Sequence, residues 1–313
     1  MSILTVMVFA VAALGVLIGV VIFRRSSSGR ESASSFTGAV IAALVIGVAL
    51  AGEFLVLGSG SWPFRSMGAP TGLEMVSWLF GIPGEWQFVA PLILGLVGVA
   101  PLLAPDTRGV RSGGATVARR TILSFVPRGW AVTCGVLALV AVGLTLIGGG
   151  MSSPDGDGRF TMWAQDVGVG EVGTLVYGWA YSWPSLIALG GLIGASTIAL
   201  AIIAHPPLGA DEQKDRARRR SRSRAVVATA SGGLFFHIGA VLIFFAKTAS
   251  LKAGVFVDED VVPVFPPFAA AGPFILLLGV AAIVSGFAVW TALLLTHARD
   301  AVAARQRVAA RAH

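Results

Sequence analysis

The chain has 313 residues, of which 55% are hydrophobic and only 12% are charged, and its mean hydropathy is +0.82. In soluble domains about a quarter of the residues are charged. A soluble core cannot bury this much apolar surface. The composition therefore excludes an ordinary soluble protein and indicates an integral membrane protein. The single cysteine, Cys134, excludes an intrachain disulfide and a cysteine-based metal site.

Seven apolar runs are each close to the roughly 20 residues that cross a bilayer as a helix. In chain order they cover residues 2–23, 36–58, 87–105, 130–150, 184–204, 225–246 and 272–296. We therefore predict an all-α fold, a polytopic bundle of seven transmembrane helices. The bundle forms one domain over residues 1–298, and a basic cytoplasmic tail follows over residues 299–313.

The first run resembles a secretory signal peptide in length, but its flanking charges differ. A signal peptide has basic residues before its apolar core. Here no basic residue precedes the run, and Arg24 and Arg25 follow it directly. This order favours a retained helix whose N-terminus lies outside. The alternative, cleavage near Ala13, leaves six spans.

Basic residues are concentrated in alternate connectors. All but four of the 23 lysines and arginines lie in segments 24–35, 106–128, 206–224 and 297–313, the exceptions being Arg65, Arg159, Lys247 and Lys252. Because positively charged loops stay in the cytoplasm, these four segments are expected on the inner face, with the C-terminus inside. The expected location is the plasma or inner membrane. The many glycines, alanines, valines and arginines and the few lysines suggest a bacterial source.

Other features bear on how the spans pack. Pro101 lacks a backbone donor and is expected to kink the third helix near its inner end. Segments 59–86 and 151–183 are rich in aromatic residues and are expected to fold against the outer membrane surface. Small residues four positions apart allow close helix contacts; the pairs are Gly15 with Gly19, Gly190 with Gly194, Ala228 with Gly232, and Ala282 with Gly286.

Ionisable residues inside spans are costly and are therefore candidates for a functional site. Glu53 lies near the outer end of the second run, and Lys247 lies at the outer end of the sixth. The two could pair if their helices are neighbours, although both could also reach the interface alone. His237, near the middle of the sixth run, could carry protons or bind a cofactor, or form a hydrogen bond to a neighbouring helix.

The densest run of charge lies in the 206–224 connector. It contains Arg216, Arg218, Arg219, Arg220, Arg222 and Arg224. Basic residues near an anionic leaflet each contribute about 1 kcal/mol to membrane binding. We expect these arginines to contact lipid headgroups or a partner. Nucleic acid is not expected as a partner, because the run lacks aromatic interleaving and a binding module.

No motif specifies a reaction. The sequence shows no catalytic constellation, no metal-ligand cluster and no phosphate-binding loop, so we assign no catalytic residue, metal or cofactor. Asp155-Gly156-Asp157-Gly158 fails as a calcium loop, because Arg159 and Phe160 occupy required positions. We expect a transport or permease subunit of unknown substrate that relies on a gradient or a separate energising subunit. The alternatives are a non-catalytic scaffold or assembly subunit, and a redox or proton-handling protein using His237 and Glu53.

Overall fold

The computed structural model describes residues 13–21, 88–104, 121–168, 170–205, 211–251, 253–257 and 260–312. Its helices are α4 (Ala90–Val99), the 3-10 helix η3 (Ala100–Leu103), α5 (Arg128–Gly150), α6 (Trp179–Ala204), α7 (Glu212–Ala249), the 3-10 helix η5 (Ala269–Ala271) and α8 (Gly272–Ala312). Its strands are β1 (Ser153–Pro154), β2 (Phe160–Asp166), β3 (Glu171–Leu175), β4 (Ala253–Val257) and β5 (Asp260–Val264). Residues 13–21 are also helical. The predicted span 36–58, the loop 59–86 and Glu53 lie outside the described residues.

Four helical stretches are long and apolar enough to cross a membrane. They are α5, α6, α7 and the segment Ala269–Arg299, which includes most of α8. These stretches match the predicted runs 130–150, 184–204, 225–246 and 272–296. The described part of the chain thus has the make-up of a membrane-spanning helix bundle. Seven spans and the orientation of the termini stay predictions.

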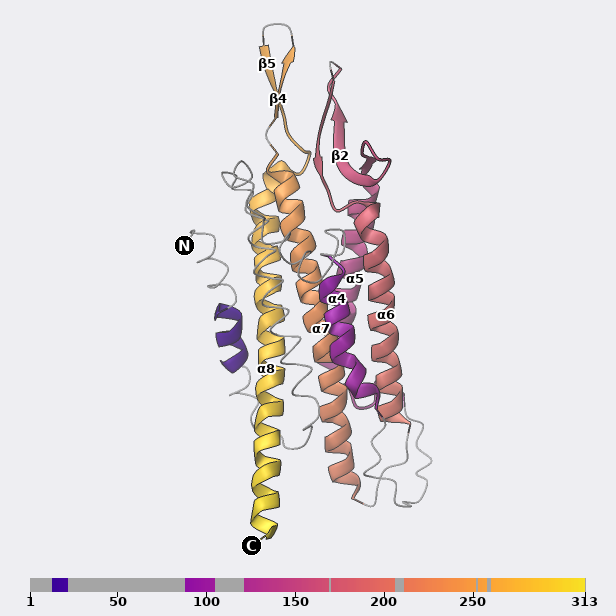
Figure 1. Cartoon of the computed structure of the whole chain (residues 1–313), viewed down its shortest axis with the longest axis vertical. Coiled ribbons are helices and arrows are strands. Elements are labelled where there is room, and N and C mark those ends of the chain that lie inside the picture. The colour runs from indigo at the N-terminus through magenta and orange to yellow at the C-terminus, as the bar shows by residue number, and fades with distance from the viewer. Residues whose placement is uncertain are drawn as a thin grey trace.

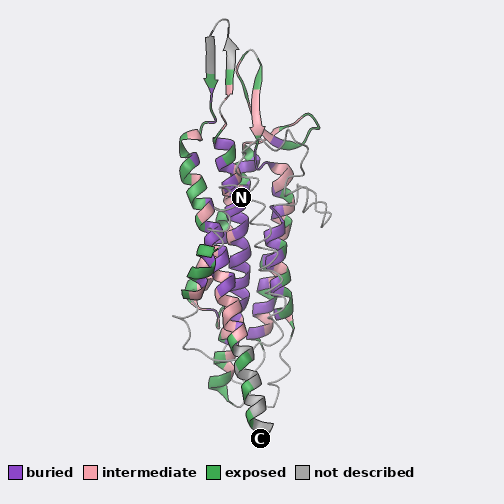
Figure 2. Ribbon diagram, turned by 60° about the vertical axis from the view of Figure 1, so that its left-hand side comes forward, coloured by how far each residue is buried: buried purple, intermediate pink, exposed green. Residues whose placement is uncertain are grey.

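Helix α7 is the centre of the bundle and contacts α4, α5, α6 and α8. The side chain of Asp211 caps its start by accepting a hydrogen bond from the backbone N–H of Lys214. From Ala225 onward most of its residues are buried, and Figure 2 shows this buried interior along the bundle axis. Because α4, α5, α6 and α8 surround this part of α7, its sequence from Ala225 onward is mostly apolar on all sides.

Close approach of α7 and α8 depends on small residues. A Cβ atom on Gly239 would lie 2.9 Å from the backbone oxygen of Gly279, so the two backbones nearly touch there. Three of the predicted small-residue pairs contribute to packing: Gly232 faces Trp290, Gly286 faces Phe236, and Gly15 and Gly19 face Phe287, Ala288 and Thr291 of α8. Gly190 and Gly194 of α6, in contrast, have no atom within 4 Å of a built Cβ among the described residues.

The third predicted span is shorter than expected. Helix α4 begins with Pro91 in its first turn, and the chain tightens to the 3-10 helix η3 at Pro101. The expected distortion at Pro101 therefore takes the form of a 3-10 turn, since proline removes the α-helical hydrogen bond. Residues 90–103 extend about 21 Å at a helical rise of about 1.5 Å, less than the roughly 30 Å of a hydrocarbon core.

The all-α prediction is incomplete, because two small antiparallel sheets lie at one end of the bundle, here called the strand end (Figure 1). One sheet has the order β1-β2-β3, and the other is the two-stranded β4-β5 hairpin. Strand β2 forms because Thr161 and Trp163 alternate with more exposed residues. The buried Trp163 joins an apolar cluster with Phe88, Val176 and Tyr177 at the top of the helices.

The opposite end of the bundle is called the arginine end, because it carries Arg216–Arg224 of α7. Helix α8 extends beyond the bundle at this end to Ala312 (Figure 1), so the predicted basic tail continues the last helix. The connections from α5 to α6 and from α7 to α8 lie at the strand end. Among the described residues, the arginines of α7 and the end of α8 therefore lie at the end of the bundle opposite these two connections.

Candidate functional site

His237 lies on α7 and is 1% exposed. Its Nδ1 atom lies 2.8 Å from the backbone oxygen of Phe88, just before α4. A carbonyl oxygen only accepts hydrogen bonds, so Nδ1 carries the proton and donates it. The imidazole therefore ties α7 to the start of α4.

Lys247 lies in the last turn of α7 and is exposed. Its charge is favourable there, because the C-terminal end of a helix carries partial negative charge. Ten residues separate it from His237, about 15 Å along the helix axis. The structure therefore does not bring these two candidates together. Pairing of Lys247 with Glu53 stays a prediction, because Glu53 is not among the described residues.

Sequence reasoning missed the hydroxyl of Tyr177, which lies next to His237, and the three hydroxyl side chains of Thr145, Ser182 and Ser185 that lie beside Tyr177. The ring of Tyr177 meets the imidazole edge-on, with centroids 6.3 Å apart. Tyr177 and Ser182 are fully buried, and neither hydroxyl has a hydrogen-bond partner among the described residues. Thr145 and Ser185 lie beside Tyr177 and donate to backbone oxygens one turn earlier on their own helices. The available signal was Ser185 in the first turn of the predicted span 184–204, with Ser182 just before that span.

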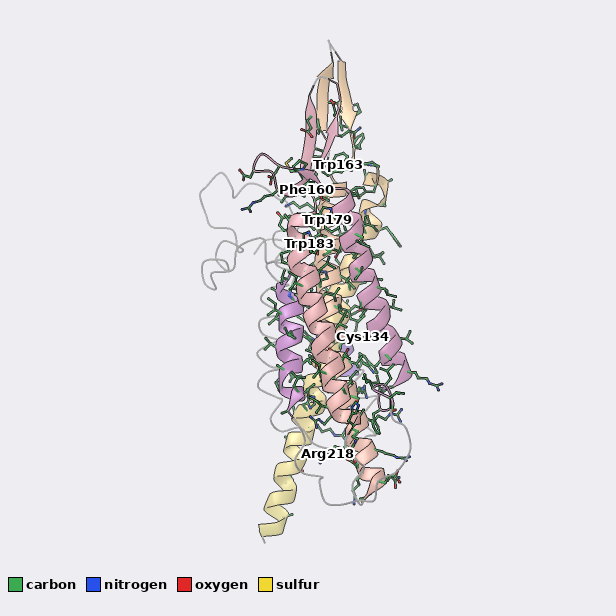
Figure 3. The ribbon with its side chains drawn as sticks, turned by 90° about the vertical axis from the view of Figure 1, so that its right-hand side faces the viewer. Cys134, Phe160, Trp163, Trp179, Trp183 and Arg218 are labelled. Atoms are coloured by element: carbon green, nitrogen blue, oxygen red, sulfur yellow. The ribbon has the colours of Figure 1, made fainter. Side chains whose placement is uncertain are left out.

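Aromatic side chains surround the strand end, as Figure 3 shows for Phe160, Trp163, Trp179 and Trp183. The rings of Trp179 and Trp183 lie 6.1 Å apart, and Trp183 is 62% exposed. Exposed tryptophans are typical of the membrane–water interface. The segment 155–158, in turn, is a surface turn in which Asp155 accepts hydrogen bonds from the backbone N–H groups of Asp157 and Arg159.

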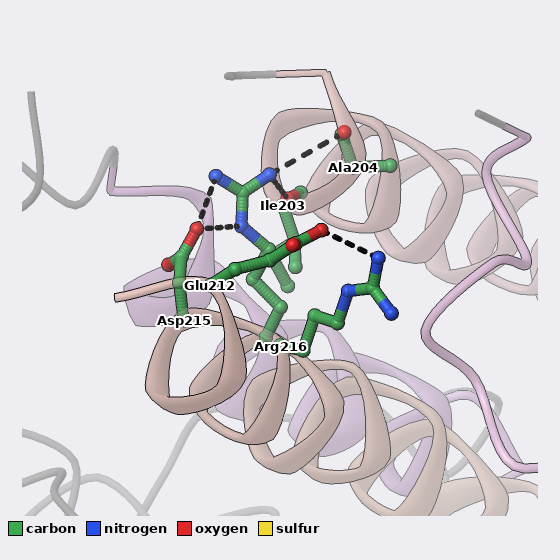
Figure 4. A network of polar contacts seen from close by, with 6 residues as sticks. Ile203, Ala204, Glu212, Asp215 and Arg216 are labelled. Carbon is green, nitrogen blue, oxygen red and sulfur yellow. Dashed lines mark hydrogen bonds and ion pairs between the residues drawn. The ribbon is translucent and has the colours of Figure 1, made fainter. Parts of the chain in front are cut away.

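The arginine end contains a network built around Arg219 (Figure 4). Arg219 is 8% exposed, and its guanidinium donates to the carboxylate of Asp215 at 3.0 Å. Its Nη1 atom donates to the backbone oxygens of Ile203 at 3.0 Å and Ala204 at 3.5 Å. These oxygens lie at the end of α6, where the last backbone oxygens of a helix have no partner within the helix itself. Arg219 therefore caps α6 and ties it to α7.

Arg222 has a similar role for the helix α4–η3. Its Nη2 atom donates to the backbone oxygens of Leu102 at 3.2 Å and Ala104 at 2.8 Å. Arg216 pairs with Glu212 on its own helix at the exposed surface. The guanidinium of Arg224 lies over the ring of Trp130 of α5. The arginine run thus serves two purposes, because Arg219 and Arg222 hold helices while Arg220 is exposed.

No cluster of three or more histidine, cysteine, aspartate or glutamate side chains in the described ranges is placed to hold a metal ion. His297, at the arginine end of α8, is buried, and His205 at the end of α6 is exposed. Gly232 on α7 faces Trp290 on α8. His297, seven residues after Trp290 on this antiparallel helix, is therefore level with about residue 225 of α7. That level is about 18 Å from His237 along the axis.

Comparisons of the chain with protein-family models, with curated proteins and with solved structures find no match.

Proposed function

We propose that this chain is a non-catalytic membrane scaffold subunit that docks a partner protein at its strand end. The proposal rests on buried polar side chains that form hydrogen bonds to the backbone of a neighbouring helix or loop. His237 binds the backbone at Phe88, and Arg219 binds the end of α6. The indole of Trp290 on α8 donates to the backbone oxygen of Thr229 on α7, 3.1 Å away. Such groups stabilise one arrangement of helices.

The β4-β5 hairpin supplies the docking surface in this proposal. It extends beyond the helices (Figure 1) and has only two strands in the described structure. An isolated two-stranded hairpin is marginally stable in water, and its open edges can pair with a strand of another chain. In the backbone register Val255 pairs with Val262 and Phe256 with Val261, so the hairpin sequence is apolar at these positions. A partner that extends this sheet would stabilise the hairpin.

The location in this proposal follows from charge. We place the protein in the cell membrane of a bacterium, with seven spans, the arginine end in the cytoplasm and the strand end outside. The concentration of arginines at one end of the bundle supports this orientation. The partner is then an extracytoplasmic or membrane protein.

Site-specific photo-crosslinking in native membranes tests the docking surface. A photoreactive amino acid at position 256 in the hairpin is expected to capture one defined protein. The matched control is position 139 on α5, where Leu139 is 74% exposed and should contact lipid alone. Absence of a protein product from positions on both hairpin strands would contradict the proposal.

A transport or permease subunit is the second candidate, favoured by the buried hydroxyls of Tyr177 and Ser182. Buried polar atoms without partners are uncommon, and a polar solute could bind them. In this case energy would come from a gradient or a separate subunit. A Ser182→Cys variant in a Cys134→Ala background distinguishes the two functions. Labelling by a membrane-impermeant thiol reagent would favour transport, and protection from it would favour the scaffold.

The third candidate, a redox or proton-handling protein using His237 and Glu53, has less support. The Nδ1 proton of His237 is donated to a backbone oxygen. This hydrogen bond between α7 and the start of α4 explains the buried histidine without a redox or proton-handling role.

A further inference from the structure

The β1-β2-β3 sheet packs one of its faces against the helices. Thr161 and Trp163 of β2 are buried on that face. Because side chains alternate along a strand, Phe160 and Met162 point to the opposite face. Leu175 of β3 is the antiparallel partner of Met162, and directly paired residues point to the same side of a sheet. The second face, here called the apolar face, thus carries Phe160, Met162 and Leu175.

The apolar face is exposed at the base of the sheet, where the strands meet the helices. Phe160 is 45% exposed and Leu175 is 51% exposed. The tip of the sheet differs, because the exposed residues Asp166 and Glu171 pair there across β2 and β3. Six residues separate Phe160 from Asp166, about 20 Å at the rise of a strand. The sheet therefore changes from apolar at its base to acidic at its tip.

Two tryptophans continue the apolar face onto α6. The backbone oxygen of Phe160 lies where a Cβ atom on Gly178 would be, so the start of β2 contacts the residue just before Trp179. The ring centres of Trp179 and Trp183, one turn apart on α6, are separated by 6.1 Å. Figure 3 shows Phe160, Trp179 and Trp183 one below the other along the bundle axis. The base of the sheet and the first turns of α6 thus form one aromatic surface.

The same side of α6 stays apolar and exposed below Trp183. Ile187 and Ile198, which are 73% and 56% exposed, follow Trp183 by four and fifteen residues, so all three share one side of the helix. Helix α6 is long and apolar enough to cross a membrane. It rises about 32 Å from Trp183 to its last residue, Ala204, which matches the roughly 30 Å of a hydrocarbon core. With Ala204 at one boundary of the core, Trp183 lies at the other.

The base of the sheet then lies at the depth of the lipid headgroups. The headgroup layer adds about 5–8 Å on each side of the hydrocarbon core. Trp179 is about 6 Å above Trp183 along the helix, within that layer, and Phe160 lies next to it. Asp166 and Glu171, about 20 Å farther along the strands, reach water. A bilayer explains this order, because aromatic side chains are favoured at headgroup depth and carboxylates are favoured in water.

We propose that the apolar face of the β1-β2-β3 sheet binds the lipid bilayer, with Phe160 and Leu175 inserted at headgroup depth beside Trp179 and Trp183. The sheet is held against the membrane by this contact, and its acidic tip stands in water. The inference goes beyond the scaffold function and requires only that α6 crosses the membrane.

Spin-label accessibility tests the proposal in the full-length chain, reconstituted in vesicles of phosphatidylcholine and phosphatidylglycerol. The label is placed on Phe160→Cys, Leu175→Cys, Asp166→Cys or Ile187→Cys in a Cys134→Ala background. Oxygen concentrates in lipid, whereas a nickel chelate stays in water. Oxygen is expected to relax the labels at positions 160 and 175 faster than the chelate does, as at the lipid reference 187. Asp166→Cys, the matched control on β2, is expected to show the reverse order.

Three results would overturn the inference. Faster relaxation by the nickel chelate at positions 160 and 175, with lipid reported at position 187, would place the apolar face in water. Slow relaxation by both reagents at positions 160 and 175 would show that protein covers the face. Faster relaxation by the chelate at position 187 would show that α6 does not cross the membrane. If Phe160→Cys does not insert, Leu175→Cys alone decides the test, because Leu175 is exposed.

Discussion

The Nδ1 atom of His237 donates a hydrogen bond to the backbone oxygen of Phe88, 2.8 Å away, and so joins α7 to a residue 149 positions earlier, just before α4. Phe88 itself is fully buried and packs edge-on against Tyr177 and Phe244. The hydrogen bond from His237 and the aromatic contacts of Phe88 therefore lie at the same level of the bundle. We therefore interpret His237 as a structural residue.

Replacing His237 tests its structural role. His237→Leu removes the Nδ1 donor from the buried Phe88 oxygen, and it is expected to lower the free energy of unfolding by about 1–3 kcal/mol. His237→Asn, whose amide can donate in place of Nδ1, is expected to lose less. The measurement is reversible unfolding in mixed micelles, with Lys247→Gln as an exposed control. Equal stability of His237→Leu and wild type would contradict the assignment.

Two of the salt bridges at the start of α7, Arg219 with Asp215 and Arg216 with Glu212, are expected to differ in strength. Arg219→Gln removes the cap of α6 and leaves Asp215 partly buried, so we expect a loss of about 2 kcal/mol. Arg216→Gln breaks an exposed pair with Glu212 on the same helix, so we expect a loss below about 1 kcal/mol. Chemical unfolding of the two variants side by side measures the difference. Similar losses would mean that the bonds from Arg219 to α6 do not stabilise the bundle.

Two glycines on α5 provide a matched test of packing. A Cβ on Gly148 would lie 2.1 Å from the backbone oxygen of Tyr177, whereas Gly143 has no atom within 4 Å of a built Cβ in the described structure. Gly148→Ala is expected to destabilise by about 1–3 kcal/mol through steric overlap. Gly143→Ala is expected to be neutral or to stabilise by up to about 1 kcal/mol, since alanine favours the helix. Thermal unfolding midpoints that shift in the opposite order would contradict the packing of α5 on Tyr177.

The turn between β1 and β2 is expected to respond to acid. The Thr161 hydroxyl and the backbone N–H of Arg159 donate to Asp155 and lower the pKa of its carboxyl below its ordinary value. Because the pKa is lower in the folded turn, Asp155 stabilises the turn above about pH 4, and this contribution is lost as the pH falls below that value. Hydrogen exchange at the amides of Asp157 and Arg159 should therefore speed up in acid. Asp155→Asn should exchange with no such pH step, and a step that persists in this variant would exclude Asp155 as its cause.

The sequence alone predicted those helices that are marked by a continuous apolar run. The apolar runs located α5 to α8, because a span must be continuous and about 20 residues long. The strands were missed, although Thr161 and Trp163 alternate with exposed residues in β2, because the aromatic content of the segment 151–183 was attributed to the membrane interface.

The site depends on contacts between distant segments, which one sequence does not reveal. The arginine run predicted a basic surface, but it could not separate Arg219 and Arg222 from Arg220. The bonds that separate them end on Ile203 and Leu102, which are 16 and 120 residues away. The tie of His237 to Phe88 was foreseen only as one of several roles for a buried histidine.

The most direct test of the scaffold account is the native size of the complex that contains this chain. A tagged chain is extracted from its native membranes in mild detergent and resolved by native electrophoresis, beside a variant in which residues 253–264 are replaced by a flexible glycine–serine linker. The account predicts that the wild-type chain migrates in a defined complex with another protein, and that the variant, equally abundant and equally stable to heat, migrates without it. Identical migration of the two forms without a partner would contradict the account.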